Sequence, residues 1–212
     1  MKTAIIGLGN IGKQVAQNLI AGGEKVIVVD HGATKAQDFA KASGGNARAL
    51  SVTDAVAEAD IIVLAIWFDA IKKFLAEHRG ELAGKILVDP SNPIAPDGSG
   101  GFKKTIPQNQ SSGVILAGLL PPGARLVKAF GSLGAASLKS GARRTPDANV
   151  LFYASDDRDA GNAVAALIGA SGFTAVRIGG IDQSIRIEVF GDLHEFGKLG
   201  KLVTAKEAAA LV

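Results

Sequence analysis

The chain has 212 residues, of which 47% are hydrophobic, and it contains no cysteine. This apolar content is enough for a full α/β core and argues against disorder, while the lack of thiols excludes disulfides, cysteine nucleophiles and cysteine metal sites. The net charge of +3 comes from dispersed lysines and arginines, and there is no signal peptide or apolar run of about 20 residues, so we expect a cytoplasmic protein without nucleic-acid or membrane partners.

Apolar runs and amphipathic stretches alternate through the first half of the chain. The apolar runs predict buried strands at 2–7, 25–30, 47–51, 60–66 and 85–89, because continuous runs are typical of a parallel sheet covered on both faces. Apolar residues at helical spacing predict helices over 11–20, 34–43, 54–59 and 69–77. Thr34 and Thr53 are the candidate N-caps of the second and third of these helices.

The second half begins with a stretch rich in Pro, Gly, Ser and Asn, at 90–113. A loop of that length inside a compact domain is usually functional, so we expect it to lie over the site. Beyond it, the pattern predicts helices at 114–120 and 156–171 and strands at 125–129, 150–154 and 174–178. The last segment, 183–203, carries apolar residues at helical spacing and is expected to be helical.

Three glycines stand between the first predicted strand and the first predicted helix. Gly7, Gly9 and Gly12 are spaced G-x-G-x-x-G, and the next strand ends on Asp30. In this context Gly7 allows the tight turn, Gly9 lets the backbone approach a diphosphate, and Gly12 lets helix and strand pack closely. The free amides and positive dipole end of the helix then face the phosphates. The arrangement predicts a dinucleotide site.

The order of elements predicts an α/β fold of the Rossmann type, a doubly wound, mainly parallel sheet with helices on both faces. We expect one compact unit over 1–212. Residues 1–94 form its NAD(P)-binding half, and residues 95–212 form an elaborated half with the C-terminal helical segment.

The residues after the second strand bear on the choice between NAD and NADP. Asp30 can accept hydrogen bonds from the ribose hydroxyls and would repel a 2′-phosphate, which favours NAD. Asp30 can instead cap a turn before His31. In that case His31, Thr34 and Lys35 lie close enough in sequence to hold a 2′-phosphate.

Several segments in order along the chain resemble the NADP oxidoreductases that depend on the deazaflavin coenzyme F-420. The matching stretches are AIIGLGNIG, ADIIVLAIWFDAI, GKILVDPSNPI, ARLVKAFGSLGAASL and VLFYASDDRDAGNAVAALIGASGF. The resemblance implies NADP as cofactor and a flavin or deazaflavin as hydride acceptor. NADP-using members usually carry Ser or Asn followed by Arg where this chain has Asp30 and His31, Asn-Thr where it has Gly131 and Ser132, and often proline near Trp67.

The resemblance also implies the residues of the site. It implies that the cofactor is held by Gly7, Gly9, Asn10, Ile11, Gly12, Ala65, Ile66, Trp67, Asn92 and Pro93. Leu8 in the same turn, and Asp30, His31 and Lys35 after the second strand, complete the expected cofactor-binding residues. The acceptor pocket would be lined by Phe130, Gly131, Ser132 and Leu133. The family tends to dimerise, so we expect a homodimer, with the apolar residues of 183–203 available to the second subunit.

Conventional catalytic groups are scarce. No metal-spaced cluster, nucleophile elbow or H-E-x-x-H motif is present in the sequence. The candidates for proton transfer are His194, Lys128 and Ser132, each of which has a structural alternative in packing, a sheet edge or a turn. The paired arginines at 143–144 are candidates for an anion site or for a solvated loop.

Three functions remain open. The first is an NAD(P)-dependent oxidoreductase that passes hydride to a flavin-like, deazaflavin or other small acceptor, which needs ring stacking but no protein nucleophile. The second is an imine or hydroxy-acid dehydrogenase with Lys128 or His194 as proton donor. The third is a non-catalytic NAD(P)-binding redox sensor. The scarcity of proton donors favours the first or the third. The acceptor-side loop with its turn at Gly131 and Ser132 favours the first over the third, because a sensor needs no second pocket.

Overall fold

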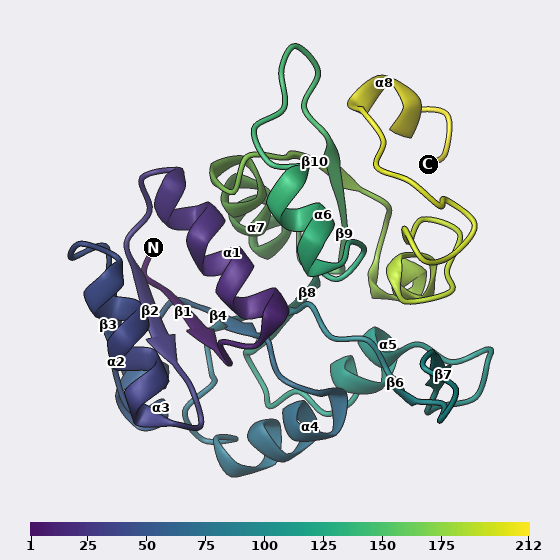
Figure 1. The fold of residues 1–212 in the computed structure, drawn as a ribbon. Helices are drawn as coiled ribbons and strands as arrows, with labels where there is room; N and C mark the ends of the chain where they lie inside the picture. The colour runs from purple at the N-terminus through teal and green to yellow at the C-terminus, as the bar shows by residue number, and fades with distance from the viewer.

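The protein is built around an eight-stranded sheet with the order β10-β9-β8-β5-β4-β1-β2-β3 (Figure 1). The computed structural model describes residues 1–212, with the side chain of Ala33 left aside. The strands of this sheet are β1 (Thr3–Ile6), β2 (Val26–Val29), β3 (Ala47–Ala49), β4 (Ile61–Leu64), β5 (Ile86–Asp89), β8 (Arg125–Lys128), β9 (Val150–Ser155) and β10 (Thr174–Arg177). They coincide with the predicted strands to within a few residues.

The sheet is mainly parallel, as predicted. Strands β3, β2, β1, β4, β5 and β8 are parallel neighbours in that order, which is the strand order of a dinucleotide-binding sheet. The direction reverses once, between β8 and β9, where only two residue pairs connect the strands. Strand β10 then pairs parallel to β9. Because all eight strands share one sheet, the second half of the chain continues the first.

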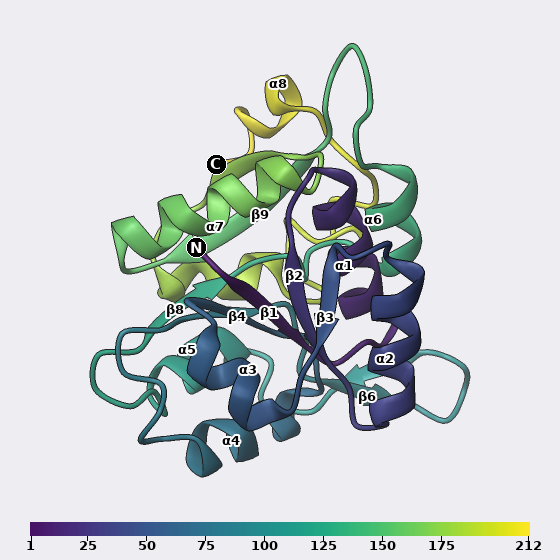
Figure 2. The same ribbon diagram turned by 90° about the vertical axis from the view of Figure 1, so that its left-hand side faces the viewer.

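Helices cover both faces of the sheet (Figure 2). One layer contains α1 (Asn10–Ala21), α2 (Ala33–Ala42), α6 (Ala135–Ser140) and α7 (Arg158–Ala170), and the other contains α3 (Val52–Glu58), α4 (Phe68–Glu77) and α5 (Ser112–Ala117). In β4, Ile61 and Val63 join the first core while Ile62 and Leu64 join the second. This double burial explains the continuous apolar runs. None of the described helices is long and apolar enough to cross a lipid bilayer.

Two predicted helix starts are wrong. Helix α3 is capped by Ser51, whose hydroxyl accepts a hydrogen bond from the amide of Asp54 at 3.1 Å, and not by Thr53. Helix α2 begins after Gly32, so Thr34 lies inside its first turn. In both cases an extended residue two positions before the threonine, Gly32 or Ser51, is the N-cap. The helix therefore begins one residue before the threonine.

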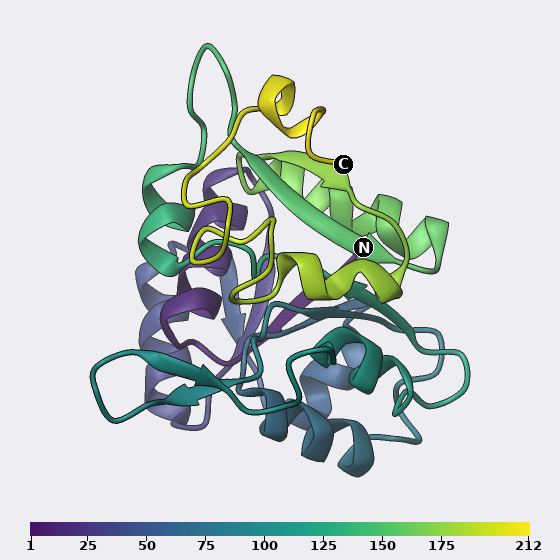
Figure 3. The same cartoon turned by 90° about the vertical axis from the view of Figure 1, so that its right-hand side faces the viewer.

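The stretch predicted as a long loop contains a small hairpin, β6 (Ile94–Pro96) and β7 (Phe102–Lys104), which extends from the body of the protein (Figure 3). The ammonium of Lys104 donates to the carbonyl oxygens of Gln108 at 3.0 Å and Gln110 at 2.6 Å. These bonds tie the hairpin to the turn before α5. Strands of three residues are too short to give a periodic signal in the sequence.

The C-terminal segment is not the helix that its apolar spacing predicted. A 3₁₀ helix, η1, covers Ile181–Ile187, and turns then follow until α8 (Ala205–Ala208). A Cβ at Gly197 would lie 1.8 Å from the carbonyl oxygen of Gly191. The backbone therefore packs directly on itself there, in contacts that a continuous helix cannot make. The apolar side chains of this segment instead cover β9 and β10 in a third small core.

Arg143 joins the C-terminal ends of two helices. Its guanidinium donates to the carbonyl oxygens of Asn18 in α1 at 2.7 Å, and of Ala170 and Ser171 at the end of α7 at 2.7 and 3.2 Å. Helix ends carry unpaired carbonyls and partial negative charge, so a cation there is favourable. Both arginines are exposed, but Arg143 is a structural cap through these three carbonyl contacts.

We expect Arg143→Ala to lower the free energy of unfolding by about 2 kcal/mol, because three carbonyls lose a charged donor. That loss corresponds to a melting temperature about 4–8 °C lower for a chain of this size. The neighbouring Arg144→Ala variant is the control and should melt within about 1–2 °C of the wild type. Equal melting temperatures for the two variants would contradict the capping role.

Candidate functional site

A cleft of about 1160 Å³ opens at the carboxyl ends of β1, β4 and β5. The chain leaves β1 toward β2 on one side of the sheet, whereas β4 lies on the other side. This is the switch point at which parallel α/β sheets bind ligands. One end of the cleft is formed by the glycine-rich turn and the residues after β2, and the other by residues after β5 and β8 and by the C-terminal segment.

Gly7 and Gly12 have the structural roles that their spacing predicted. Gly7 has φ +96°, and a Cβ there would lie 2.4 Å from the carbonyl oxygen of Ala65 at the end of β4. A Cβ on Gly12 would lie 1.9 Å from the carbonyl oxygen of Gly7. The absence of a Cβ at both positions therefore lets the backbone of α1 pack directly on the turn and on the end of β4.

Gly9 is different, because a Cβ there would meet nothing within 4 Å. It lines the cleft with Asn10 and Ile11 and is the N-cap of α1, which has neither a side-chain cap nor an acidic residue in its first turn. The positive end of the helix dipole therefore faces open space. The residues present fit a diphosphate bridge at this position.

Asp30 lies at the same end of the cleft, with a side chain 13% exposed. One carboxylate oxygen accepts from the amide of Leu8 at 2.7 Å and from the Lys35 ammonium at 3.2 Å, and the other accepts from the amide of Gly32 at 3.3 Å. Burial alone would raise the pKa of Asp30, but these hydrogen bonds and the charge of Lys35 together lower it. Asp30 therefore stays ionised. It both caps the turn and faces the cleft, where His31 also lies.

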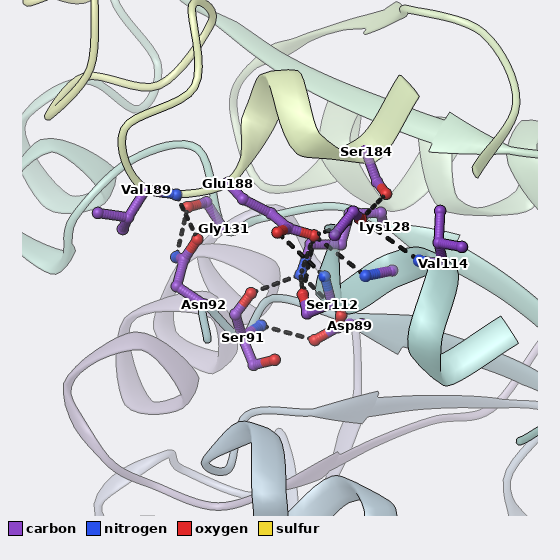
Figure 4. A network of polar contacts seen from close by, with 12 residues as sticks. Asp89, Ser91, Asn92, Ser112, Val114, Lys128, Gly131, Ser184, Glu188 and Val189 are labelled. Carbon is purple, nitrogen blue, oxygen red and sulfur yellow. Dashed lines mark hydrogen bonds and ion pairs between the residues drawn. The ribbon is translucent and has the colours of Figure 1, made fainter. Parts of the chain in front are cut away.

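Asn92 organises the opposite end. Its side-chain amide donates to the carbonyl oxygen of Gly131 at 3.1 Å, and its oxygen accepts from the amide of Val189 at 2.7 Å (Figure 4). A Cβ on Gly131 would lie 2.6 Å from the carbonyl oxygen of Pro90. Three segments distant in sequence therefore meet at Asn92, and all of them line the cleft.

Lys128 lies behind this wall and not in the cleft lining. It is 1% exposed, and its ammonium donates to the Asp89 carboxylate at 2.7 Å, the Ser91 carbonyl at 2.5 Å and the Ser112 hydroxyl at 2.9 Å (Figure 4). Glu188 lies 3.8 Å from the same ammonium. All three ammonium donors are engaged, so the structure corrects the interpretation of Lys128 as a proton donor or a sheet-edge lysine.

His194 does line the cleft, as a neutral group. Its side chain is buried and its Nδ1 accepts from the amide of Phe196 at 2.9 Å. Burial lowers the pKa of His194 to about 4, against a smaller opposing effect from its hydrogen bond to the Gly131 backbone. The hydrogen-bond partners assign the proton to Nε2. At neutral pH the imidazole is thus uncharged, with its Nδ1 bonded to the backbone amide of Phe196.

The other predicted residues divide into lining and supporting positions. The cleft is lined by Gly7, Gly9, Asn10, Ile11, Asp30, His31, Lys35, Ala65, Ile66, Trp67, Asn92, Gly131, Leu133 and His194. Buried behind it are Leu8, Gly12, Pro93, Phe130, Ser132 and Lys128. The Ser132 hydroxyl is buried and has no hydrogen-bond partner among the described residues.

Sequence reasoning missed part of the lining. Phe102 from the hairpin and Phe190 and Phe196 from the C-terminal segment are all exposed, line the cleft and join the predicted Trp67. Every exposed aromatic side chain in the described part of the chain lies on this cleft. His78 also lines it, with its ring 4.6 Å from that of Phe74. No local pattern marks an aromatic residue as exposed.

We expect the buried state of His194 to make stability depend on pH. Because its folded pKa of about 4 lies below the unfolded value near 6.5, the unfolded chain binds more protons between these values. The contribution of His194 to the free energy of unfolding is therefore fully present above pH 6.5. It is lost as the pH falls toward 4, by up to about 3 kcal/mol.

Urea unfolding between pH 4.5 and 7.5 measures this effect. His194→Asn keeps an acceptor for the Phe196 amide but does not titrate, so its free energy of unfolding should change less with pH than that of the wild type. His31→Asn, at an exposed position, should keep the wild-type slope. Parallel slopes for wild type and His194→Asn would refute the assignment.

Comparison with known proteins places this geometry in a family. The family model described as "NADP oxidoreductase coenzyme F420-dependent" matches residues 2–93. The F420-dependent NADP reductase of Methanothermobacter thermautotrophicus is 30% identical over 199 residues, which cover 89% of this chain and 85% of that reductase. The crystal structure of a hypothetical protein from Sinorhizobium meliloti is 29% identical, with a TM-score of 0.84 and coverage of 96% of this chain and 95% of that one.

The metalloreductase STEAP3 of Rattus norvegicus is 29% identical over 188 residues, or 88% of this chain. The match covers 36% of STEAP3, so the chain spans about a third of the length of this relative. The identity to the full-length reductase, together with the glycine-rich turn at the switch point of the sheet, decides the assignment. The chain belongs to the family of coenzyme F420-dependent NADP oxidoreductases.

Proposed function

We propose that this protein transfers hydride between a nicotinamide cofactor and a flat, largely apolar acceptor of the flavin or deazaflavin class. The observation that carries the proposal is one continuous cleft with two unlike ends. One end offers the open N-terminus of α1 beside Gly9, and the other is rimmed by exposed aromatic side chains. A dinucleotide fits the first end and a planar ring fits the second.

The cofactor would be held by residues of the first half of the chain. The amides at the start of α1 would bind its diphosphate, and Asp30 would face the adenosine ribose. Ala65 and Ile66, at the end of β4, would support the nicotinamide half, with Asn92 beyond them. A bound nicotinamide supplies the hydride. The residues of this chain orient the two rings and keep water away.

The acceptor end favours a planar, apolar partner. Trp67, Phe102, Phe190 and Phe196 all leave aromatic surface exposed on the cleft, and exposed apolar surface gathered in one place is typical of a binding site. Aromatic faces stack with flat rings. A carbonyl or imine substrate would need a proton donor near its oxygen or nitrogen, and the engaged Lys128 and the neutral His194 lend that alternative little support.

Asp30 supports NADH as the preferred cofactor, in contrast to the NADP of the named reductase relative. Its ionised carboxylate stands at the ribose end of the cleft, where it can accept hydrogen bonds from hydroxyls but repels a phosphate. The adjacent Lys35 is already paired with it at 3.2 Å, which leaves that cation less available to a 2′-phosphate.

The diphosphate site can be tested at Gly9. Gly9→Val should fold normally, because Gly9 has φ −67° and its Cβ direction is open, but the side chain would fill the space proposed for the diphosphate. We expect the Kd for NADH to rise at least about tenfold in a fluorescence titration, with an unchanged melting temperature. Gly80→Val is the matched control, since Gly80 also has open space at its Cβ and lies outside the cleft lining. Wild-type affinity in Gly9→Val would reject the site.

The role of Asp30 can be tested by removing its charge. Asp30→Asn keeps an oxygen for the Leu8 amide but no longer repels a phosphate, so the ratio of NADPH to NADH affinity should rise about tenfold. Asp38→Asn, an exposed change on α2 outside the cleft, should leave the ratio at its wild-type value. If the two variants give the same ratio, Asp30 does not select the cofactor.

A further inference from the structure

Phe190 combines two features that are rarely found together. Its backbone has φ +73°, in the left-handed region that side-chain-bearing residues seldom adopt. Its side chain is 49% exposed and lines the cleft. A bulky residue in this conformation is strained. The exposed half of its side chain makes no packing contacts that would offset the strain.

The strain comes from a tight turn. The amide of Gly191 donates to the carbonyl oxygen of Glu188 at 2.8 Å, so Phe190 is the third residue of a four-residue turn. At this position a positive φ favours glycine or asparagine. Glycine would therefore suit the backbone better than the phenylalanine that is present.

The first two residues of the turn are anchored to other segments, which restrains the turn. The amide of Val189 donates to Asn92, and the Glu188 carboxylate accepts from the Ser111 hydroxyl at 2.8 Å, the Ser112 hydroxyl at 2.8 Å and the Gly113 amide at 3.0 Å (Figure 4). Strained conformations persist where the surroundings determine them in this way, and they gather at functional sites.

Packing and capping account for the other two strained residues. Among the described residues that are not glycine, a positive φ occurs only at Phe130, Arg143 and Phe190. The Phe130 side chain is buried in the core, and Arg143 makes the three carbonyl contacts described above. Of these three residues, Phe190 alone presents its side chain to the cleft, whose lining also includes Val189, His194 and Phe196.

We propose that Phe190 is a specificity-determining residue for the hydride acceptor, with the strained turn holding its ring where a flat acceptor ring stacks on it. The inference rests on the proposed function, because it names the residue that recognises the acceptor in that same cleft. The turn gives up backbone stability so that the ring is fixed in position before the acceptor arrives, and a fixed ring loses less freedom on binding.

Three substitutions separate the ring from the strain. Phe190→Gly removes both, Phe190→Ala removes the ring and keeps the strain, and Phe190→Tyr keeps both. The readouts are the melting temperature, the Kd for NADH, the KM and kcat for riboflavin and for a deazaflavin, and the Kd of each ring from fluorescence quenching. Leu119→Ala, at an exposed apolar position outside the cleft lining, is the control.

We expect Phe190→Gly to melt about 2–4 °C above Phe190→Ala, because only glycine relieves the strain. Both should raise the KM and Kd of the acceptor about tenfold, while kcat and the NADH affinity stay within about twofold of the wild type. Phe190→Tyr and Leu119→Ala should retain wild-type acceptor affinity.

Other outcomes separate this inference from the proposed function. Acceptor affinities unchanged in both Phe190→Gly and Phe190→Ala, with lower melting temperatures, would make the ring a packing element and overturn the inference alone. A wild type that binds NADH but neither riboflavin nor the deazaflavin would also overturn it. A wild type that binds no pyridine nucleotide would refute the proposed function itself, whatever the Phe190 variants do.

Discussion

A buried ion pair between Lys128 and Asp89 joins the two halves of this protein directly behind the cleft. The pair joins the ends of β5 and β8, and Glu188 from the C-terminal segment lies 3.8 Å from the same ammonium. Charges taken out of water are destabilising unless each is paired and hydrogen-bonded. Here each charged group has a further partner. Asp89 accepts from the Ser91 amide, Lys128 donates to the Ser112 hydroxyl, and Glu188 accepts from the Ser112 amide at the start of α5. Loss of one member would leave an uncompensated buried charge, which typically costs about 3–5 kcal/mol.

The same pair shapes the cleft wall in front of it. Asp89 accepts from the amide of Ser91 at 2.7 Å, and Lys128 donates to the carbonyl oxygen of Ser91 at 2.5 Å, so the backbone of this residue is held at both ends. Asn92 follows immediately and positions Gly131 and Val189. The acceptor end of the cleft is therefore built by buried polar groups that join distant segments. The cofactor end is built by the backbone of one strand, one turn and one helix.

This difference explains what the sequence could and could not predict. The glycine-rich turn and Asp30 lie within 25 residues of each other, so local sequence was enough to predict that they lie together, and both lie at one end of the cleft. Lys128 follows an apolar strand just as a sheet-edge lysine would, and its partners Asp89 and Glu188 are far away in the chain. Nothing near Lys128 in sequence indicates its burial. The prediction of a helix in the C-terminal segment was wrong for a related reason. The backbone contact between Gly191 and Gly197 is made only in the folded chain, and apolar spacing in the sequence does not indicate it.

The placement of charge then determines how the acceptor can be recognised. Lys128 and Glu188 are buried in the layer behind the wall, where their mutual contacts satisfy them. The wall itself presents a neutral imidazole and aromatic rings to the cleft, because burial lowers the pKa of His194 to about 4. Ion pairing with the acceptor ring is therefore weak at this surface, and ring shape and stacking are left to discriminate. A fixed aromatic face at Phe190 is the kind of element that such recognition requires, which gives a physical reason for strain in a turn that glycine would otherwise occupy.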